Sequence, residues 1–379
     1  MRRSVRAAAA LLVLLAAGRS SAGVLPDDRA DVLFHSYDGG GITVQGPSVL
    51  VQKKLSKQFS ASANYYVDKV SSASIDVITT ASPYKEERKQ YSVGLDYLHE
   101  GWLMSLGVIT SRENDYSADT LNFGISQDFF GDLTTLSLGY SKGDDRVGRR
   151  GDATFSDAVR RQNYRVGLSQ ILTKNLLLGL SWETITDEGF LNNPYRSVRY
   201  LDEQSPRGYS YEPEVYPRTR TSDAGALRLR YYLPYRAAIH GEYRGYADSW
   251  DIRATTAELG YTHPLDNGWT IEADLRLYSQ DKADFYSDLF PRADFQNFMA
   301  RDKELSTFTS RTLRLGLSYD VLKGGWRFVD KGSVNLTYDH MEFEYEDFRD
   351  LRVTGLPAGQ EPSFGFTADV VQIFVSFWF

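Results

Sequence analysis

The sequence ends with the stretch VVQIFVSFWF, residues 370–379, in which every second position is apolar or aromatic. The alternating positions are Val371, Ile373, Val375, Phe377 and Phe379. A period of two is typical of a β-strand with one apolar face. A last strand that alternates up to a terminal Phe resembles the recognition signal that bacterial outer-membrane assembly machinery reads. The stretch therefore predicts a membrane-embedded strand and that machinery as a partner.

The same alternation recurs along the rest of the chain, for example in residues 91–97, 227–231, 271–277 and 313–319. It predicts strands at about 32–37, 49–55, 59–67, 89–99, 102–110, 120–128, 133–142, 162–171, 176–186, 222–233, 237–246, 253–263, 269–280, 306–320, 332–343 and 366–379. A soluble sandwich of strands would alternate in the same way, so the connections between strands must decide the fold.

Short and long connections alternate along the chain. The short turns fall near residues 56–58, 100–101, 130–132, 173–175, 234–236, 265–268 and 322–325. The long polar connections are 68–87, 111–119, 143–160, 187–220, 282–305 and 344–362, with 247–252 as a shorter one. This arrangement predicts an all-β fold, a single antiparallel transmembrane β-barrel of about 16 strands, with short periplasmic turns and long extracellular loops.

The first residues have the pattern of a cleaved secretory signal peptide. Arg2, Arg3 and Arg6 precede an apolar run over residues 7–17, and small residues follow. Such a run is too short to span a bilayer, which favours cleavage over anchoring. We expect a signal peptide at residues 1–22, cleavage between Ala22 and Gly23, and a barrel domain at 23–379 in the outer membrane of a Gram-negative bacterium.

Composition excludes several classes of function. The 379 residues contain no Cys, which rules out a disulfide framework, a thiolate metal site and a cysteine nucleophile. The 43 basic and 50 acidic residues give a net charge of −7, and without a basic block nucleic acid is not an expected partner. The lipid bilayer of the outer membrane is the expected surrounding.

The polar parity of the strands should face the barrel lumen. The side chains on that face are small in the first half of the chain and densely charged in the second half. The candidate lumen-lining residues are Arg228, Arg230, Glu242, Arg244, Glu258, Glu272, Asp274, Arg276, Arg314 and Asp320, with His240 and Asp339 beside them. They form either a selectivity lining or an internal salt-bridge network that stiffens and partly plugs the barrel.

The sequence offers little catalytic chemistry. None of the five His lies in a metal-binding spacing, and no GxSxG motif occurs. His340, with Asp339 and Glu342 close by, is the one candidate for a hydrolase at the outer rim, but a solvated rim histidine is the preferred explanation, because any acidic chain offers such neighbours. We therefore predict no catalytic residues, no metal, no cofactor and no enzyme activity.

Several blocks of the chain resemble the domain-of-unknown-function family 3570. They are residues 46–51 (GPSVLV), 70–88 (VSSASIDVITTASPYKEER), 248–250 (DSW) and 298–305 (FMARDKEL). The resemblance covers nearly the whole mature chain and implies a bacterial outer-membrane barrel of unassigned activity. It also implies a small lipoprotein, a thioredoxin-like protein and a flavin transferase as envelope neighbours, and it brings no catalytic residues.

Three functions follow from these observations. The first is a porin-like channel or binding barrel for a small solute or a partner lipoprotein. The second is a plugged structural scaffold in an envelope redox or flavinylation system, with a thioredoxin-like or lipoprotein partner. The third and weakest is a hydrolase at the outer rim.

Overall fold

The computed structural model describes residues 23–72, 84–322 and 324–379, and nearly all of its regular structure is β-strand. The strands are β1 (Arg29–Gly39), β2 (Ile42–Lys54), β3 (Phe59–Ser72), β4 (Tyr84–His99), β5 (Trp102–Arg112), β6 (Tyr116–Phe129), β7 (Thr134–Arg149), β8 (Asp152–Thr173), β9 (Leu176–Gly189), β10 (Ser197–Leu201), β11 (Tyr209–Pro213), β12 (Thr219–Tyr232), β13 (Ala238–Asp248), β14 (Arg253–Pro264), β15 (Trp269–Gln280), β16 (Phe308–Leu322), β17 (Lys331–Arg349) and β18 (Ser363–Trp378). One 3-10 helix, η1 (Lys303–Leu305), interrupts a loop.

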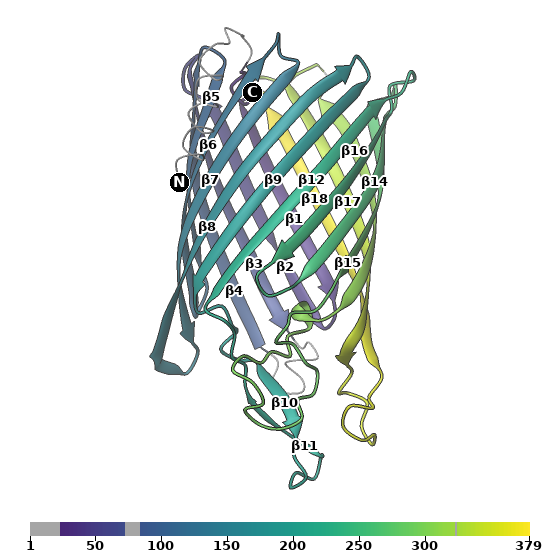
Figure 1. The fold of residues 1–379 in the computed structure, drawn as a ribbon. Helices are drawn as coiled ribbons and strands as arrows, with labels where there is room; N and C mark the ends of the chain where they lie inside the picture. The colour runs from purple at the N-terminus through teal and green to yellow at the C-terminus, as the bar shows by residue number, and fades with distance from the viewer. Residues whose placement is uncertain (1–22, 73–83, 323) are drawn as a thin grey trace.

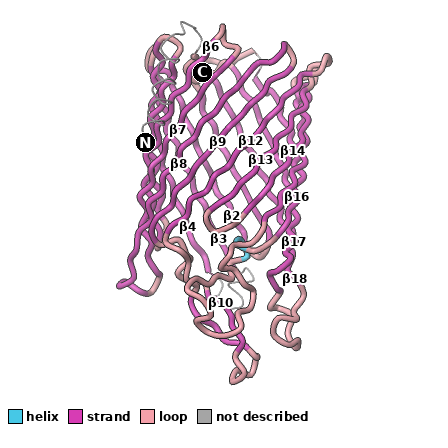
Figure 2. Tube along the Cα trace, viewed as in Figure 1, coloured by secondary structure: helices cyan, strands magenta, loops and turns pink. Residues whose placement is uncertain are grey.

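All strands except β10 and β11 form one closed antiparallel barrel (Figure 1). Each barrel strand pairs with its neighbour in the sequence, apart from β9, which pairs directly with β12, and β1, which pairs with β18 to close the ring. β10 and β11 form a separate two-stranded sheet among the loops at one end (Figure 2). Closure leaves no unpaired sheet edge, which a membrane-spanning sheet requires.

The outer face of the barrel is apolar. Leu259, Leu275 and Leu313 lie side by side on β14, β15 and β16, and their exposed fractions are 62%, 48% and 47%. Aromatic pairs such as Trp269 and Tyr319, with ring centroids 4.5 Å apart, lie near strand ends on the same face. So much exposed apolar surface is stable in lipid rather than in water.

The predicted strands are confirmed, including the pairing partner expected before β2. β1 and β2 are joined through Gly40 and Gly41, whose φ angles of +59° and +80° suit a tight hairpin turn. Among the described residues, no helix is both long and apolar enough to cross a membrane.

Several strands run further than predicted at the end of the barrel that carries the long loops, the long-loop end. β7 continues to Arg149, and β8 begins at Asp152. The predicted 143–160 loop is therefore an extended hairpin that projects beyond the rim (Figure 1). The predicted loop 111–119 is likewise only a short turn between β5 and β6. Backbone pairing continues in these hairpins after the apolar pattern ends, because outside the membrane both faces meet water.

Three loops at the long-loop end pack together into a structure that we term the loop cap, residues 190–218, 281–307 and 350–362. Its core includes Tyr216, Phe285 and Tyr286, packed on Trp250 from the β13–β14 turn. Burial raises the pKa of both Tyr216 and Tyr286 well above the usual tyrosine value. The loops therefore have an ordered apolar core of their own.

Candidate functional site

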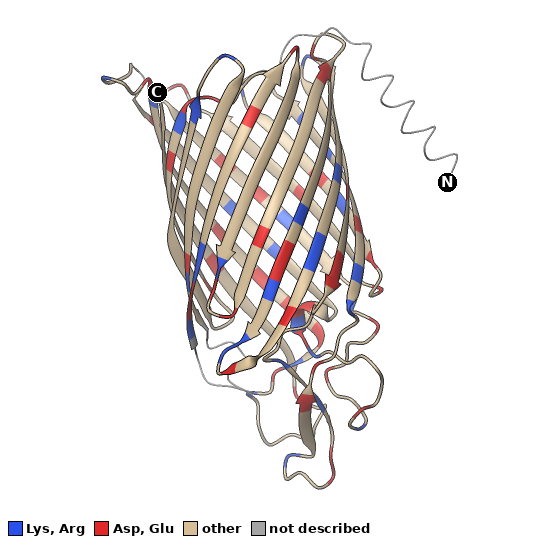
Figure 3. Ribbon diagram, turned by 90° about the vertical axis from the view of Figure 1, so that its left-hand side faces the viewer, with Lys and Arg blue, Asp and Glu red and all other residues tan. Residues whose placement is uncertain are grey.

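Charged residues gather in one part of the barrel (Figure 3), and we term those on the inner face of β8, β9 and β12–β17 the charged wall. A cavity of about 870 Å³ lies against it. The charged residues that line this cavity are Arg165, Glu183, Arg228, Arg230, Glu242, Arg244 and Glu258, together with His240. Successive residues of a strand point to opposite faces of the sheet, and these charged residues alternate with the exposed leucines of the outer face. The cavity therefore lies inside the barrel.

Most of these charges are paired across neighbouring strands. Arg165 donates to Glu183 at 2.7 Å, and Arg244 lies 3.6 Å from the same carboxylate. Arg228 donates to Glu242 on the adjacent strand. On β16 and β17, Arg314 makes two hydrogen bonds of 2.7 Å to Asp339. The wall is thus a mixed-sign network, in which ion pairs hold the side chains in place.

The wall is nevertheless open to solvent. Arg228, Arg230, Glu272 and Arg276 are all exposed although they face the interior of the barrel. Arg230 and Arg276 make no side-chain ion pair or hydrogen bond with any other described residue. Two guanidinium groups are therefore free to meet a solute inside the barrel.

The predicted lumen residues fall on one continuous surface. Arg228, Arg230, Glu242, Arg244 and Glu258 line the cavity, while Glu272, Asp274, Arg276 and Arg314 continue the inner face on β15 and β16. Asp320 lies at the opposite, short-turn end of the barrel, 4.0 Å from Lys331.

The residues of the proposed assembly signal lie on β18 and just beyond it. Val371, Ile373, Val375 and Phe377 share the outward face of β18, between β1 and β17. Phe379 follows the strand, and its ring lies 4.6 Å from the Lys53 ammonium. Residues 1–22 lie outside the described residues, so cleavage between Ala22 and Gly23 stays a prediction.

A buried arginine joins the three loops of the cap. The Arg199 side chain, on β10, is fully buried and donates to Glu361 at 2.6 and 3.1 Å. It also binds the Asp288 carboxylate, which Arg301 approaches at 2.9 Å. Burial alone would raise the pKa of Glu361, but the hydrogen bonds and charge of Arg199 outweigh it and lower that pKa. We term this cluster the cap lock.

The cap reaches into the mouth of the barrel through η1. The inward-facing Gln280 side chain donates to the carbonyl oxygens of Glu304 and Ser306, at 2.9 and 2.8 Å. A cavity of about 170 Å³ lies between Glu304 and the inner wall, where Arg220, Arg244 and Tyr278 are among its lining residues. The long-loop mouth is thus narrowed by a segment held to the wall by hydrogen bonds.

Of the residues considered for a rim hydrolase, Glu342 lies near His340 but Asp339 does not. Asp339 faces the lumen and binds Arg314, whereas His340 faces the other side of β17. The ring of His340 lies 2.8 Å from Asp369 and 3.9 Å from Glu342. Because neighbours in a strand point to opposite faces, an adjacent Asp and His cannot act as a pair.

One cluster was not found from the sequence. His240, Glu258 and Asp274 bring one imidazole and two carboxylates together on the inner wall. Their separation in sequence follows no metal-binding motif, because three different strands supply them. The strand register, which the hairpin turns fix, could have revealed the cluster.

Comparison with protein families identifies the chain. Residues 75–330 match the family described as Protein of unknown function (DUF3570). The chain belongs to this family. The match is narrower than the resemblance predicted, since residues 46–51 lie outside it. One of the resembling blocks, residues 298–305, lies in the cap of this DUF3570 member and contributes to its apolar clusters. Trp250, from another block, packs against the cap from the β13–β14 turn.

Outer-membrane proteins are among the solved structures that are similar to this chain. A bacterial polysaccharide outer membrane secretin matches 94% of this chain and 100% of its own, with a TM-score of 0.50 and 9% identity. The siderophore receptor PirA from Pseudomonas aeruginosa matches 94% of this chain and 81% of its own, with a TM-score of 0.44 and 11% identity. OccK2 (OpdF) from the same organism, solved with glucuronate, matches 94% and 100%, with a TM-score of 0.41 and 11% identity. No curated protein matches the sequence.

The fold and the apolar outer face place this DUF3570 protein in the outer membrane of a Gram-negative bacterium. The lipid bilayer is its surrounding. In barrels of this kind the short turns face the periplasm and the long loops the exterior.

Proposed function

We propose that the protein is a porin-like barrel that admits or binds a small polar solute. The observation that carries the proposal is the charged wall: its exposed Arg230 lines a cavity of about 870 Å³, and its exposed Arg276 continues the same inner face on β15. Neither side chain forms an ion pair or hydrogen bond with another described residue. A barrel of about 16 strands is wide enough for an aqueous channel when its loops leave room. Paired charges fix the wall, and the free guanidinium groups are available to a solute with acceptor oxygens.

Single-channel recording tests this proposal. Protein refolded in detergent and inserted into a planar bilayer should give steady openings. The double variant Arg230→Ala/Arg276→Ala should shift ion selectivity towards cations, because two uncompensated positive charges leave the wall. Arg352→Ala, which removes an arginine from the cap, is the matched control and should leave selectivity unchanged.

Silence from a barrel that migrates as a folded, heat-modifiable species would contradict the channel. It would favour the scaffold alternative, in which η1 and the cap close the mouth and a lipoprotein or thioredoxin-like partner binds the barrel. Openings whose selectivity ignores Arg230 and Arg276 would instead remove the charged wall from the path of the solute.

A further inference from the structure

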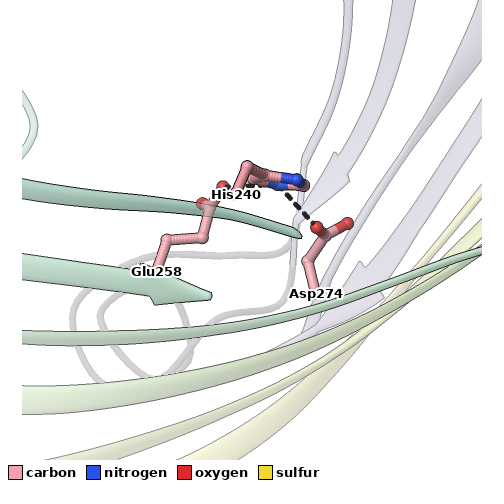
Figure 4. Close-up of side chains that lie close together, drawn as sticks. All are labelled: His240, Glu258 and Asp274. Carbon is pink, nitrogen blue, oxygen red and sulfur yellow. Dashed lines mark ion pairs between the residues drawn. The ribbon is translucent and has the colours of Figure 1, made fainter. Parts of the chain in front are cut away.

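Three adjacent strands place one imidazole and two carboxylates together on the inner wall (Figure 4). His240 comes from β13, Glu258 from β14 and Asp274 from β15. The Nε2 atom of His240 lies 3.0 Å from Oδ1 of Asp274 and 3.9 Å from Oε1 of Glu258. Ligand atoms from all three residues lie within 4.8 Å of one another.

Gly260 makes this close approach possible. The register sets it opposite His240 on one side and opposite Asp274 on the other. A Cβ atom at position 260 would lie 2.0 Å from Oδ1 of Asp274 and 2.2 Å from Cε1 of His240. The space above this glycine is therefore shared by the two side chains, and any other residue would force them apart.

One buried oxygen of the cluster makes no hydrogen bond with the protein. Oδ1 of Asp274 is buried and lies 3.0 Å from Nε2 of His240, but this contact lacks hydrogen-bond geometry, and no other described residue donates to the oxygen. Buried polar atoms without a hydrogen bond are uncommon and costly in native proteins. An ion bound between Nε2 and Oδ1 would satisfy this oxygen.

The neighbouring arginines form no hydrogen bond or ion pair with the two carboxylates. Arg314 is the register partner of Asp274, yet both of its hydrogen bonds go to Asp339, and its charge acts on Asp274 and Glu258 only through space. Arg276 is the register partner of Glu258 but forms no ion pair with it. Among the described residues, His240 is thus the direct ion-pair partner of both carboxylates.

We propose that His240, Glu258 and Asp274 form a binding site for a divalent transition-metal ion in the lumen wall. One nitrogen and two oxygen donors suit first-row ions such as Mn²⁺, Fe²⁺ or Zn²⁺, whereas Mg²⁺ and Ca²⁺ prefer oxygen donors alone. Ligands at about 2.0–2.2 Å from such an ion lie roughly 3–3.5 Å apart. The 3.0 Å between His240 and Asp274 falls in this range, and the Glu258 side chain, 3.9 Å from His240, would move inwards on binding.

The site is accessible and coordinatively open. His240 and Glu258 both line the lumen cavity, so an ion can reach them from the water inside the barrel. Three protein ligands leave a position for water or for an oxygen of a solute. This inference does not depend on the proposed function, because binding at the wall does not require that the lumen conducts.

Competition for Zn²⁺ between untagged, refolded protein and a chromogenic chelator tests the site. We expect one Zn²⁺ per chain, with affinity reduced about tenfold or more in His240→Ala and in Asp274→Asn. Gly260→Ala should weaken binding similarly although it keeps every ligand. His263→Ala, on the same strand as Glu258, is the matched control that should bind like the wild type.

Two results would overturn the proposal. One is the absence of Zn²⁺ binding by correctly folded wild-type protein, and the other is binding that His240→Ala and Asp274→Asn leave unchanged. Heat-modifiable migration confirms the fold of each variant. If Gly260→Ala does not fold, the two ligand variants test the site on their own. Zn²⁺ binding that persists in both of them would contradict the proposed site. Zn²⁺ binding by a barrel that shows no conductance would support the site while contradicting the channel.

Discussion

The cap lock allows a sharp test of how the three loops are held together, through the substitution Arg199→Ala. The Arg199 side chain is fully buried, and its loss leaves Glu361, whose side chain is 5% exposed, without its counter-charge. Asp288, 10% exposed, keeps only Arg301. Removing one partner of a buried ion pair costs about 3–5 kcal/mol, because the remaining charge stays desolvated. The free energy of opening the cap should fall by that amount.

Arg352→Ala is the matched control within the same cap. Arg352 also binds a carboxylate at 2.7 Å, that of Asp350, but its side chain is 52% exposed. An exposed pair of this kind contributes about 0–1 kcal/mol. The two variants thus remove the same type of side chain and differ in burial.

Hydrogen exchange of cap amides measures the difference. The amides of Leu201, Phe290 and Val215 bond between loops at 2.9–3.0 Å, to Phe290, Arg199 and Met299 respectively. In Arg199→Ala these amides should exchange about 100- to 3000-fold faster, within the limit set by the stability of the cap, and in Arg352→Ala less than about fivefold faster. Amides within β16 should not change. Equal exchange in the two variants would refute the conclusion that burial of Arg199 holds the cap closed.

Three further predictions follow from the same structure. Arg199 lowers the pKa of Glu361 in the folded cap, so the stabilisation is complete above the ordinary value of 4.5 and is lost as pH falls through the lower folded value. The protection factors of the cap amides should therefore fall in acid, and protection factors that do not change with pH would contradict this. Gly46→Ala should destabilise the barrel by about 1–3 kcal/mol in urea unfolding, because a Cβ there would lie 1.8 Å from a backbone oxygen of β3, whereas Gly245→Ala, with nothing within 4 Å, should not. Leu106→Arg, on the lipid face of β5, should cost up to about 4 kcal/mol in the same assay, while Ser105→Arg on the lumen face should cost little.

The strands and the closure of the barrel were predictable because each strand places only one of its two faces in lipid. Lipid selects apolar residues at every second position, so that period and the alternation of short and long connections determine the strand count. The ends of the strands at the long-loop side were not predictable, since β7 and β8 leave the apolar pattern behind before their hairpin ends.

The cap and the His240 cluster could not be predicted in the same way. Arg199, Asp288 and Glu361 come from three loops whose contact depends on packing of the folded chain rather than on a local pattern. His240 and Asp274 meet only because the register sets Gly260 between them. The sequence alone indicated that these residues face the lumen, and the pairing of strands determines which of them touch.

The position of the charged wall within the ring suggests why only half of the lumen is charged. In the order of strands around the barrel, β5 lies eight places from β15 in a ring of 16, so the two face each other. The inner face of β5 carries Ser105 and Gly107, which leave space in front of the charges on β15. A larger residue such as Leu at position 107, where an added Cβ would meet nothing closer than 3.7 Å, should therefore reduce conductance without altering selectivity. Removal of Arg230 and Arg276 should alter selectivity without reducing conductance. Both results together are expected only if one wall of the lumen sets its width and the opposite wall sets its charge.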